Sequence, residues 1–321
     1  MIKKPLSRKT IAVTITGALL ALVTGLACWF QEPSLVSVPQ AAALGLVEGL
    51  TEYLPVSSTG HLIVASHAMD LSEFGARSGR FGREVVKNPA VSAFEIVIQL
   101  GAILAVLGLY RGRVEQMALG IAGRDPQGLR LAKLLALAAA PAMIVGLALH
   151  RPIQEHLFGP LTVSLALIAG GLLMIAVETL WRGRTHIDGG DIEQMAYWQA
   201  LAIGVAQIAA LWPGTSRSMI TIVAAMLVGM NRRPAAEFSF LLALPTLGAA
   251  TVFEALQSYR EFVNSVGIGS LLVGMVTSAL VAAAAIKLLV KWLNHHGLAV
   301  FGAYRIAAGV ALLWYFHEIV L

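Results

Sequence analysis

The chain of 321 residues contains one cysteine, Cys28, and few charged residues. Only 13% of its positions are Asp, Glu, Lys or Arg, whereas 57% are hydrophobic, and the mean hydropathy is +0.76. One cysteine excludes an internal disulfide, and no group of His and Cys residues has the spacing of a zinc site. The scarcity of charge excludes an ordinary soluble domain. This composition is typical of a polytopic membrane protein.

The N-terminal segment carries Lys3, Lys4, Arg8 and Lys9 before an apolar run at 11–30. This run is too long for a typical signal-peptide core and long enough to span a bilayer. We therefore expect residues 1–37 to form an uncleaved, signal-anchor-like helix before a polytopic domain at 38–321. Lipoprotein-type processing at Cys28 is the weaker alternative, because glycine stands three residues before it.

Six later apolar segments are long enough to cross a membrane. They lie at about 93–110, 131–149, 160–180, 237–258, 268–290 and 299–318. Two further regions consist of shorter apolar pieces, 40–54 with 56–69 and 198–212 with 214–230, each broken by a proline. A broken backbone in a membrane is tolerated where it is buried or lines a cavity. The pattern therefore predicts an all-α integral membrane protein with six core transmembrane helices and two re-entrant helix pairs.

The two broken regions resemble each other in sequence. The stretch from Gln40 through Pro55-Val-Ser-Ser can be laid over the stretch from Gln199 through Pro213-Gly-Thr-Ser with a one-residue gap. This similarity indicates an internal repeat, with one copy at about 38–150 and the other at about 160–321.

The distribution of Lys and Arg predicts the orientation of the two copies. With the N-terminus inside the cell, 15 of the 23 Lys and Arg residues fall in inner loops, and Arg217 and Arg305 fall within apolar segments. The outer loops then hold only Arg77, Arg80, Arg83, Lys87, Arg151 and Arg260. The positive-inside rule favours this arrangement. The re-entrant pairs would then enter from opposite sides as an inverted repeat, and their tips would meet near the midplane.

Charge also bears on the partners. The net charge of +5 comes from basic residues scattered between apolar segments, without a single basic patch interleaved with aromatics. We therefore expect the bilayer, and not a nucleic acid, as the partner of this chain; a homodimer is compatible with the sequence.

The first broken region, which reads E-G-L-T-E-Y-L-P-V-S-S-T-G-H at 48–61, contains many polar residues. Such residues are costly to bury in lipid. Glu48 and Glu52 are four residues apart and share one face of a helix, so they can hold a divalent cation or act as metal ligand and base. Three residues with hydroxyl side chains follow Pro55, and their hydroxyls and backbone N–H groups can bind an anion. The next polar residue is a candidate general acid. These are Ser57, Ser58, Thr59 and His61.

The second broken region supplies a turn that opens another helix and carries a fixed cation. Its residues are Gly214, Thr215, Ser216, Arg217 and Ser218. The planar fork of arginine suits phosphate oxygens. Together the two regions offer an anion cradle, a cation, a carboxylate pair, a nucleophile and an acid, which is the inventory of a phosphoryl-transfer site. Its substrate would enter from the lipid.

The motif at 48–61 and P-G-T-S-R-S at 213–218 resemble the two signatures of the undecaprenyl-diphosphate phosphatase family, also called the bacitracin-resistance proteins. F-E-I-V-I-Q-L-G at 94–101 and E-F-S-F-L-L-A-L-P at 237–245 are similar to it as well. The resemblance covers about 38–321. Two positions depart from the family pattern, Thr215 and Met219, where an aromatic residue and a glycine are usual.

The resemblance implies hydrolysis of undecaprenyl diphosphate to undecaprenyl phosphate, which recycles the lipid carrier for cell-wall synthesis. It also implies Mg²⁺ or Ca²⁺ as cofactor and a multi-pass protein of the bacterial inner membrane with its site open to the periplasm. Functional positions carried over from the family are Glu48, Glu52, Ser58, His61, Ser216 and Arg217, with Thr59 and Thr221 in secondary roles.

Two alternatives stay open. Ser58 is the favoured nucleophile, activated by Glu52 or His61, but a water under Glu52 or His61 itself are rivals. Inverted repeats with broken helices are also typical of secondary transporters, so the same fold could translocate a polyprenyl phosphate lipid.

Overall fold

The computed structural model describes residues 35–77, 83–87, 89–149, 152–153, 157, 159–180, 190–257 and 267–316. The expected signal-anchor helix, which would precede this part, lies outside the described residues. The elements in chain order are α2 (Val38–Thr51), α3 (Ser58–Ala68), β1 (Ser72–Arg77), β2 (Arg83–Lys87), α4 (Pro89–Leu109), α5 (Arg111–Ile121), α6 (Pro126–Ala148), α8 (Pro160–Leu180), η2 (Ile192–Gln194), α9 (Tyr197–Gln207), η3 (Ile208–Leu211), α10 (Arg217–Leu227), α11 (Arg232–Gln257), α13 (Ile268–Leu293) and α14 (Ala299–Tyr315).

The helical membrane fold predicted from the sequence is confirmed. Within the described residues, four helices are long and apolar enough to cross a membrane, namely α6, α8, α13 and the 232–253 part of α11. The other two expected spans correspond to α4 and to the shorter apolar helix α14. The chain is therefore an integral membrane protein.

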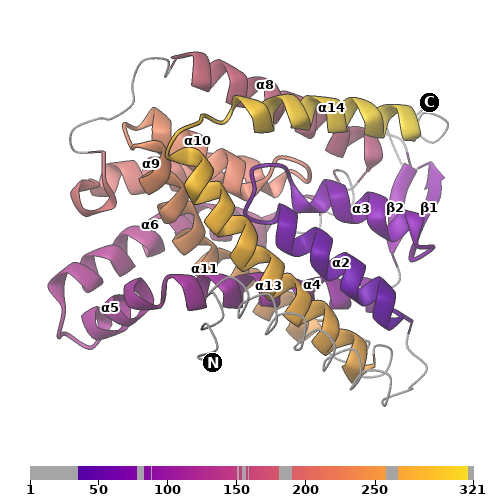
Figure 1. Ribbon diagram of the computed structural model, residues 1–321, viewed down its shortest axis with the longest axis horizontal. Coiled ribbons are helices and arrows are strands. Elements are labelled where there is room, and N and C mark those ends of the chain that lie inside the picture. Colours follow the sequence, from indigo (N-terminus) through magenta and orange to yellow (C-terminus); the bar gives the residue numbers. More distant parts are fainter. Residues whose placement is uncertain are drawn as a thin grey trace, which may run out of the picture.

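Two features of the described chain were not expected from hydropathy. The path bends by 83° where α4 ends and α5 begins, so α5 does not continue the direction of α4. In addition, β1 and β2 form an antiparallel hairpin, with Ser72 opposite Lys87, in the loop between α3 and α4. The hairpin lies at one side of the molecule, next to α3 (Figure 1).

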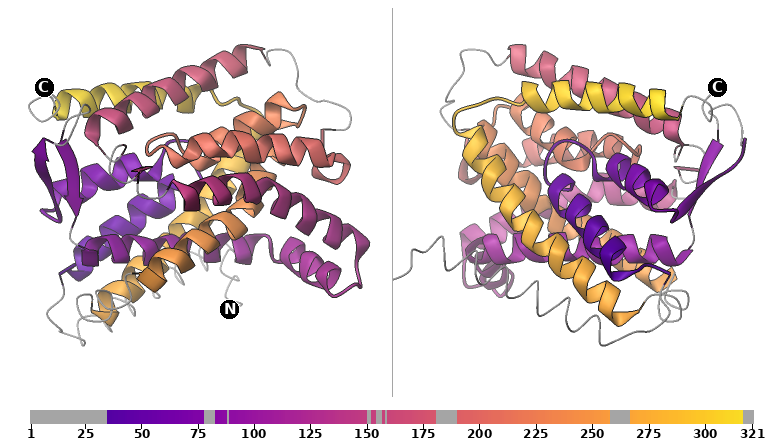
Figure 2. Two further views of the ribbon diagram at one scale, coloured as in Figure 1. Left: turned by 180° about the vertical axis from the view of Figure 1, so that it is seen from behind. Right: turned by 45° about the vertical axis from the view of Figure 1, so that its right-hand side comes forward.

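The two broken regions form helix pairs that enter the molecule from opposite sides. Figure 1 shows α2 and α3 on one side and α9 and α10 on the other. Across the end of both pairs lie α8 and α14, side by side in all three views (Figures 1 and 2). Pro55 and Pro213 stand between the two members of each pair and favour the break there, because proline has no N–H to donate to the preceding turn.

Equivalent hydrogen bonds fix the two pairs. The side-chain oxygen of Gln40 accepts from the backbone N–H of Ser37, and its amide donates to the carbonyl of Met69 at the end of α3. Gln199 accepts from the N–H of Ala196 and donates to the carbonyl of Val228 at the end of α10. In both pairs the glutamine spans 29 residues and ties the start of the first helix to the end of the second.

Close packing also sets the depth of each pair. In α2, a side chain at Gly45 would clash with the backbone of Gly274 in α13, and in α9 a side chain at Gly204 would clash with the backbone of Ala138 in α6. The absence of side chains lets the helix backbones touch, as is common between membrane helices. Each re-entrant pair is thus braced by a long helix from the other half of the chain.

Candidate active site

Both re-entrant tips have the same unusual backbone at the residue before the second helix. Ser57 has φ 76° and ψ 102°, and Ser216 has φ 70° and ψ 113°. Residues other than glycine rarely adopt positive φ, and such strain is found preferentially at functional sites. The residues that follow, Ser58 and Arg217, start α3 and α10 at equivalent positions.

Glu52 joins these two equivalent positions. Its Oε2 accepts a hydrogen bond of 2.7 Å from the hydroxyl of Ser58, and its Oε1 lies 3.0 Å from Nη2 of Arg217. The side chains of Glu52 and Arg217 are only 7% and 10% exposed. Glu52 thus forms a buried ion pair with Arg217 and at the same time accepts a hydrogen bond from Ser58.

Arg217 is held on its other side by the protein backbone. Its Nη1 donates to the carbonyl of Ser239 in α11 at 2.8 Å, and its guanidinium carbon lies 5.5 Å from the centre of the Tyr53 ring. The hydroxyl of Ser239 is in turn 2.7 Å from that of Thr221. Thr221 is fully buried, and its hydroxyl supports Ser239, whose carbonyl orients Arg217.

The remaining hydroxyls of the second tip connect it to the first. The hydroxyl of Ser216 caps α10 by accepting from the N–H of Met219 and lies 3.0 Å from the hydroxyl of Ser218. Ser218 donates to the carbonyl of Leu54 in the first tip at 3.1 Å. The N–H of Thr215 bonds to the carbonyl of Trp212 and closes the turn before α10.

His61 lies one turn into α3 and faces a different partner. Its Nδ1 is 2.7 Å from the carbonyl oxygen of Ser57, and its Nε2 is 2.6 Å from the hydroxyl of Tyr304 in α14. Thr59 is in the first turn of the same helix and is partly exposed. Glu48 is buried one turn before Glu52 in α2.

A buried arginine outside the two signature motifs holds the two tips together. Arg305 in α14 is fully buried and donates to three backbone carbonyls, those of Pro55 at 3.4 Å, Ala166 at 3.1 Å and Gly214 at 2.9 Å. Gly170 in α8 provides the space, because a side chain there would clash with the guanidinium. One buried cation thus bridges the first tip, the second tip and α8.

All the sequence-predicted groups therefore lie at or next to the meeting point of the two pairs. The structure brings Glu52, Ser58 and Arg217 into direct contact, whereas His61 makes its bonds to Ser57 and Tyr304. Sequence reasoning missed Tyr304 and Ser239. No sequence motif marks either residue. Tyr304 lies in an apolar helix, and Ser239 acts through its backbone carbonyl, which every residue has.

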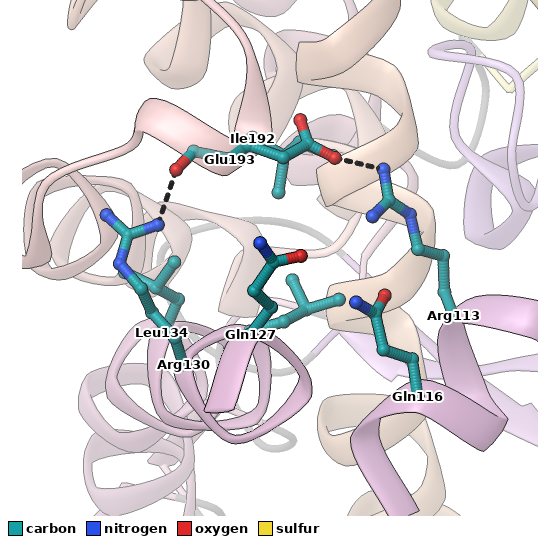
Figure 3. A pocket seen from close by; sticks show the side chains of 8 residues that line it. Arg113, Gln116, Gln127, Arg130, Leu134, Ile192 and Glu193 are labelled. Carbon is teal, nitrogen blue, oxygen red and sulfur yellow. Dashed lines mark hydrogen bonds and ion pairs between the residues drawn. The ribbon is translucent and has the colours of Figure 1, made fainter. Parts of the chain in front are cut away.

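A separate polar pocket lies at α5, α6 and η2, away from the two tips. Its volume is about 240 Å³, and its lining consists of Arg113, Gln116, Gln127, Arg130, Leu131, Leu134, Ile192 and Glu193. Figure 3 shows both arginines reaching Glu193, one to its carboxylate and the other to its backbone carbonyl. Arg113 also bonds to Glu237. These bonds anchor the segment that leads into α9, so the pocket has a structural explanation.

Comparison with known proteins agrees with this geometry. Residues 41–311 match the family model described as "Bacitracin resistance protein BacA". A protein of Sorangium cellulosum named "Undecaprenyl-diphosphatase" is 48% identical over 275 residues, which cover 85% of each chain. A protein of Rhodospirillum rubrum named "Undecaprenyl-diphosphatase 2" is 42% identical over 279 residues, covering 87% of this chain and 95% of its own.

A further relative, from Pseudomonas aeruginosa PAO1 and also named "Undecaprenyl-diphosphatase", is 40% identical over 282 residues, covering 87% of this chain and 95% of its own. Matches of this extent and identity reach beyond the two signature motifs and include the helices that brace them. The chain described here belongs to the bacitracin resistance protein BacA family.

Proposed function

We propose that this chain is a membrane phosphatase that removes the terminal phosphate of undecaprenyl diphosphate. The observation that carries the proposal is the contact of Glu52 with both Ser58 and Arg217 at a buried point reached by two re-entrant tips. The names of the relatives supply the substrate. A substrate with a long hydrocarbon tail and a charged head suits a polar site enclosed by apolar helices.

Ser58 is the nucleophile in this proposal, and Glu52 is its base. The bond of 2.7 Å from the hydroxyl to Oε2 already has the geometry for proton transfer. Oγ of Ser58 attacks the terminal phosphorus, the anhydride P–O bond breaks, and undecaprenyl phosphate leaves with the bridging oxygen. Water then cleaves the phosphoserine to release phosphate, and the proton taken by Glu52 returns to Ser58.

Arg217 stabilises the charge on the transferred group. Its guanidinium is fixed from one side by Ser239 and from the other by Glu52, so it needs little reorganisation when the phosphoryl group arrives. The backbone N–H groups that open α3 and α10 add further donors for phosphate oxygens, because the first N–H groups of a helix lack partners within the helix.

His61 is less suited to be the nucleophile. Both of its ring nitrogens lie within hydrogen-bond distance of protein atoms, the Ser57 carbonyl and the Tyr304 hydroxyl. This favours a supporting acid or base role for His61. A water activated by Glu52 is the remaining rival to Ser58.

Glu48 and Glu52 would hold a divalent cation, Mg²⁺ or Ca²⁺. Within the described part of the chain, no group of three or more His, Cys, Asp and Glu side chains is placed to bind a metal. Two buried carboxylates fit Mg²⁺, which is commonly bound by one or two carboxylates together with phosphate oxygens of the substrate. When bound, the cation would neutralise charge on the diphosphate.

The apolar helices and the bacterial relatives support a location in the inner membrane, and the distribution of Lys and Arg supports an orientation with the N-terminus inside. In that orientation the α2–α3 pair, which carries Glu52, Ser58 and His61, enters from outside, so the site would open to the periplasm.

The test is phosphate release by detergent-purified protein from a C55 or C15 diphosphate, with and without chelator. Wild type should release phosphate, whereas Ser58→Ala and Glu52→Ala should be slower by at least about 100-fold, as expected for loss of a nucleophile or base. Ser37→Ala, at the opposite end of α2, is the matched control and should be close to wild type. Near-normal turnover of both site variants would reject the scheme.

Two added measurements separate the alternatives. Acid quenching followed by mass spectrometry should find phosphate on Ser58; turnover without any phosphoserine would favour direct attack by water. Lipid translocation in vesicles by a protein that releases no phosphate would favour the transporter.

A further inference from the structure

A hydrogen bond to Tyr304 ties His61 to α14. Its hydroxyl oxygen lies 2.6 Å from Nε2 of His61, and the two rings are nearly parallel, at 5° with centroids 5.7 Å apart. The next residue, Arg305, is anchored to the carbonyls of Pro55 and Gly214. The position of Tyr304 is therefore fixed relative to both tips of the site.

The partners of the imidazole define its tautomer. A backbone carbonyl can only accept a hydrogen bond, so the contact with Ser57 requires the proton on Nδ1. In the neutral ring, Nε2 is then an acceptor, and the hydroxyl of Tyr304 donates to it. When the ring gains a proton, Nε2 donates to the same oxygen after a rotation of the hydroxyl. Tyr304 thus serves both protonation states without movement of heavy atoms.

We propose that Tyr304 is a positioning residue for His61 in the phosphoryl-transfer reaction. The inference rests on the proposed function. Through its hydroxyl, Tyr304 holds the plane of the imidazole while the Ser57 carbonyl keeps the proton on Nδ1, as a third group orients the base in other covalent hydrolases. Tyr304 as a whole is 48% exposed, so it contributes little to the buried core.

Removal of only the hydroxyl separates these roles, because Tyr304→Phe keeps the ring and its stacking. Loss of a group that orients a functional histidine at metal sites costs about 10- to 100-fold in activity, and we expect a similar fall in kcat with KM within about twofold. Tyr315→Phe is the matched control. Tyr315 lies in the same helix, is 53% exposed and packs against His67 and Phe316 by its ring, so this variant should keep wild-type kcat.

A double-mutant cycle then shows whether Tyr304 acts through His61. If it does, Tyr304→Phe added to His61→Ala should cause no further loss of phosphate release. The proposal is overturned if Tyr304→Phe has wild-type kcat, or if it slows His61→Ala by the same factor as it slows wild type. A wild-type rate in His61→Ala with a slow Tyr304→Phe would also overturn it.

A spectroscopic readout keeps the inference apart from the proposed function. In protein with ¹⁵N-labelled histidine, the resonances of His61 are those absent from His61→Ala. The Nε2 resonance should report a hydrogen-bonded acceptor in wild type and should shift toward that of an unbonded ring nitrogen in Tyr304→Phe, because only the partner of Nε2 is removed. The same Nε2 resonance in both proteins would overturn the inference even if phosphate is released, whereas the expected shift in a protein that releases no phosphate would sustain the orienting role and reject only the function.

Discussion

Replacement of Arg305 by methionine should loosen both tips of the site at once. The guanidinium is fully buried and bonds to the carbonyls of Pro55, Ala166 and Gly214. Two of these bonds, at 2.9 and 3.1 Å, are well formed, and the third is long at 3.4 Å. Methionine fills much of the same volume but leaves all three carbonyls without this donor.

The magnitude follows from these contacts. Hydrogen bonds to charged groups contribute about 1.5–3 kcal/mol each, so two good bonds and one weak one amount to roughly 4–7 kcal/mol. Removing the buried charge recovers a desolvation cost of several kcal/mol. We expect a net loss of about 2–4 kcal/mol, after both contributions are combined. The melting temperature should fall by several degrees.

The effect on turnover should exceed the effect on stability. Pro55 and Gly214 lie three residues before Ser58 and Arg217, respectively, and a displacement of about 1 Å at a site can cost about 100-fold in rate. We therefore expect phosphate release to fall by at least about 100-fold in Arg305→Met. Arg305→Lys should not restore it, because a point charge cannot reach three carbonyls from one position.

Arg232→Met is the matched control for this experiment. Arg232 pairs with Glu178 at 2.6 Å, and both side chains are largely buried, at 18% and 14% exposed. Its loss should lower the melting temperature but leave phosphate release within a few-fold of wild type. If Arg305→Met melted and turned over like wild type, the bridge between the tips would have no energetic role.

Three further predictions concern other parts of the molecule. Gly214 has φ 94° and a side chain there would clash with the carbonyl of Val163, so Gly214→Ala should reduce phosphate release about 100-fold; wild-type activity would exclude strain at this turn. The hydrogen bond from Arg113 lowers the pKa of Glu193 below its ordinary 4.5, so its stabilisation is present above that value and lost as the pH falls through the lowered pKa. Glu193→Gln should therefore melt below wild type at pH 7, and the difference should vanish in acid; a pH-independent difference would contradict this. Glu48→Gln should raise the Mg²⁺ concentration needed for half-maximal phosphate release by at least about tenfold, and an unchanged dependence would remove Glu48 from the metal site.

The sequence predicted the membrane fold and both re-entrant pairs because the governing forces act locally. Apolar length identifies spans, and Pro55 and Pro213 mark the breaks. The cost of charge in lipid pointed to Glu52 and Arg217, which the structure places in contact although 165 residues separate them. Their pairing followed from the repeat, and not from either motif alone.

What the sequence did not reveal depends on distant contacts or on backbone geometry. The bend before α5 arises where an apolar helix meets the polar stretch that begins at Arg111, and hydropathy only marks such a stretch as a loop. Tyr304 is 243 residues from His61. Three carbonyl acceptors for Arg305 could not be read from residue types, because every residue has a carbonyl.

The bracing of each re-entrant pair by the opposite half of the chain affects how the protein is made. The α2 helix packs its glycine face on α13, which the ribosome completes long after α2 has entered the membrane. Until then the glycine face of α2 has no helix to pack against. A product truncated before α13 would therefore leave that face of α2 unpacked in the membrane and be a target for quality-control proteases.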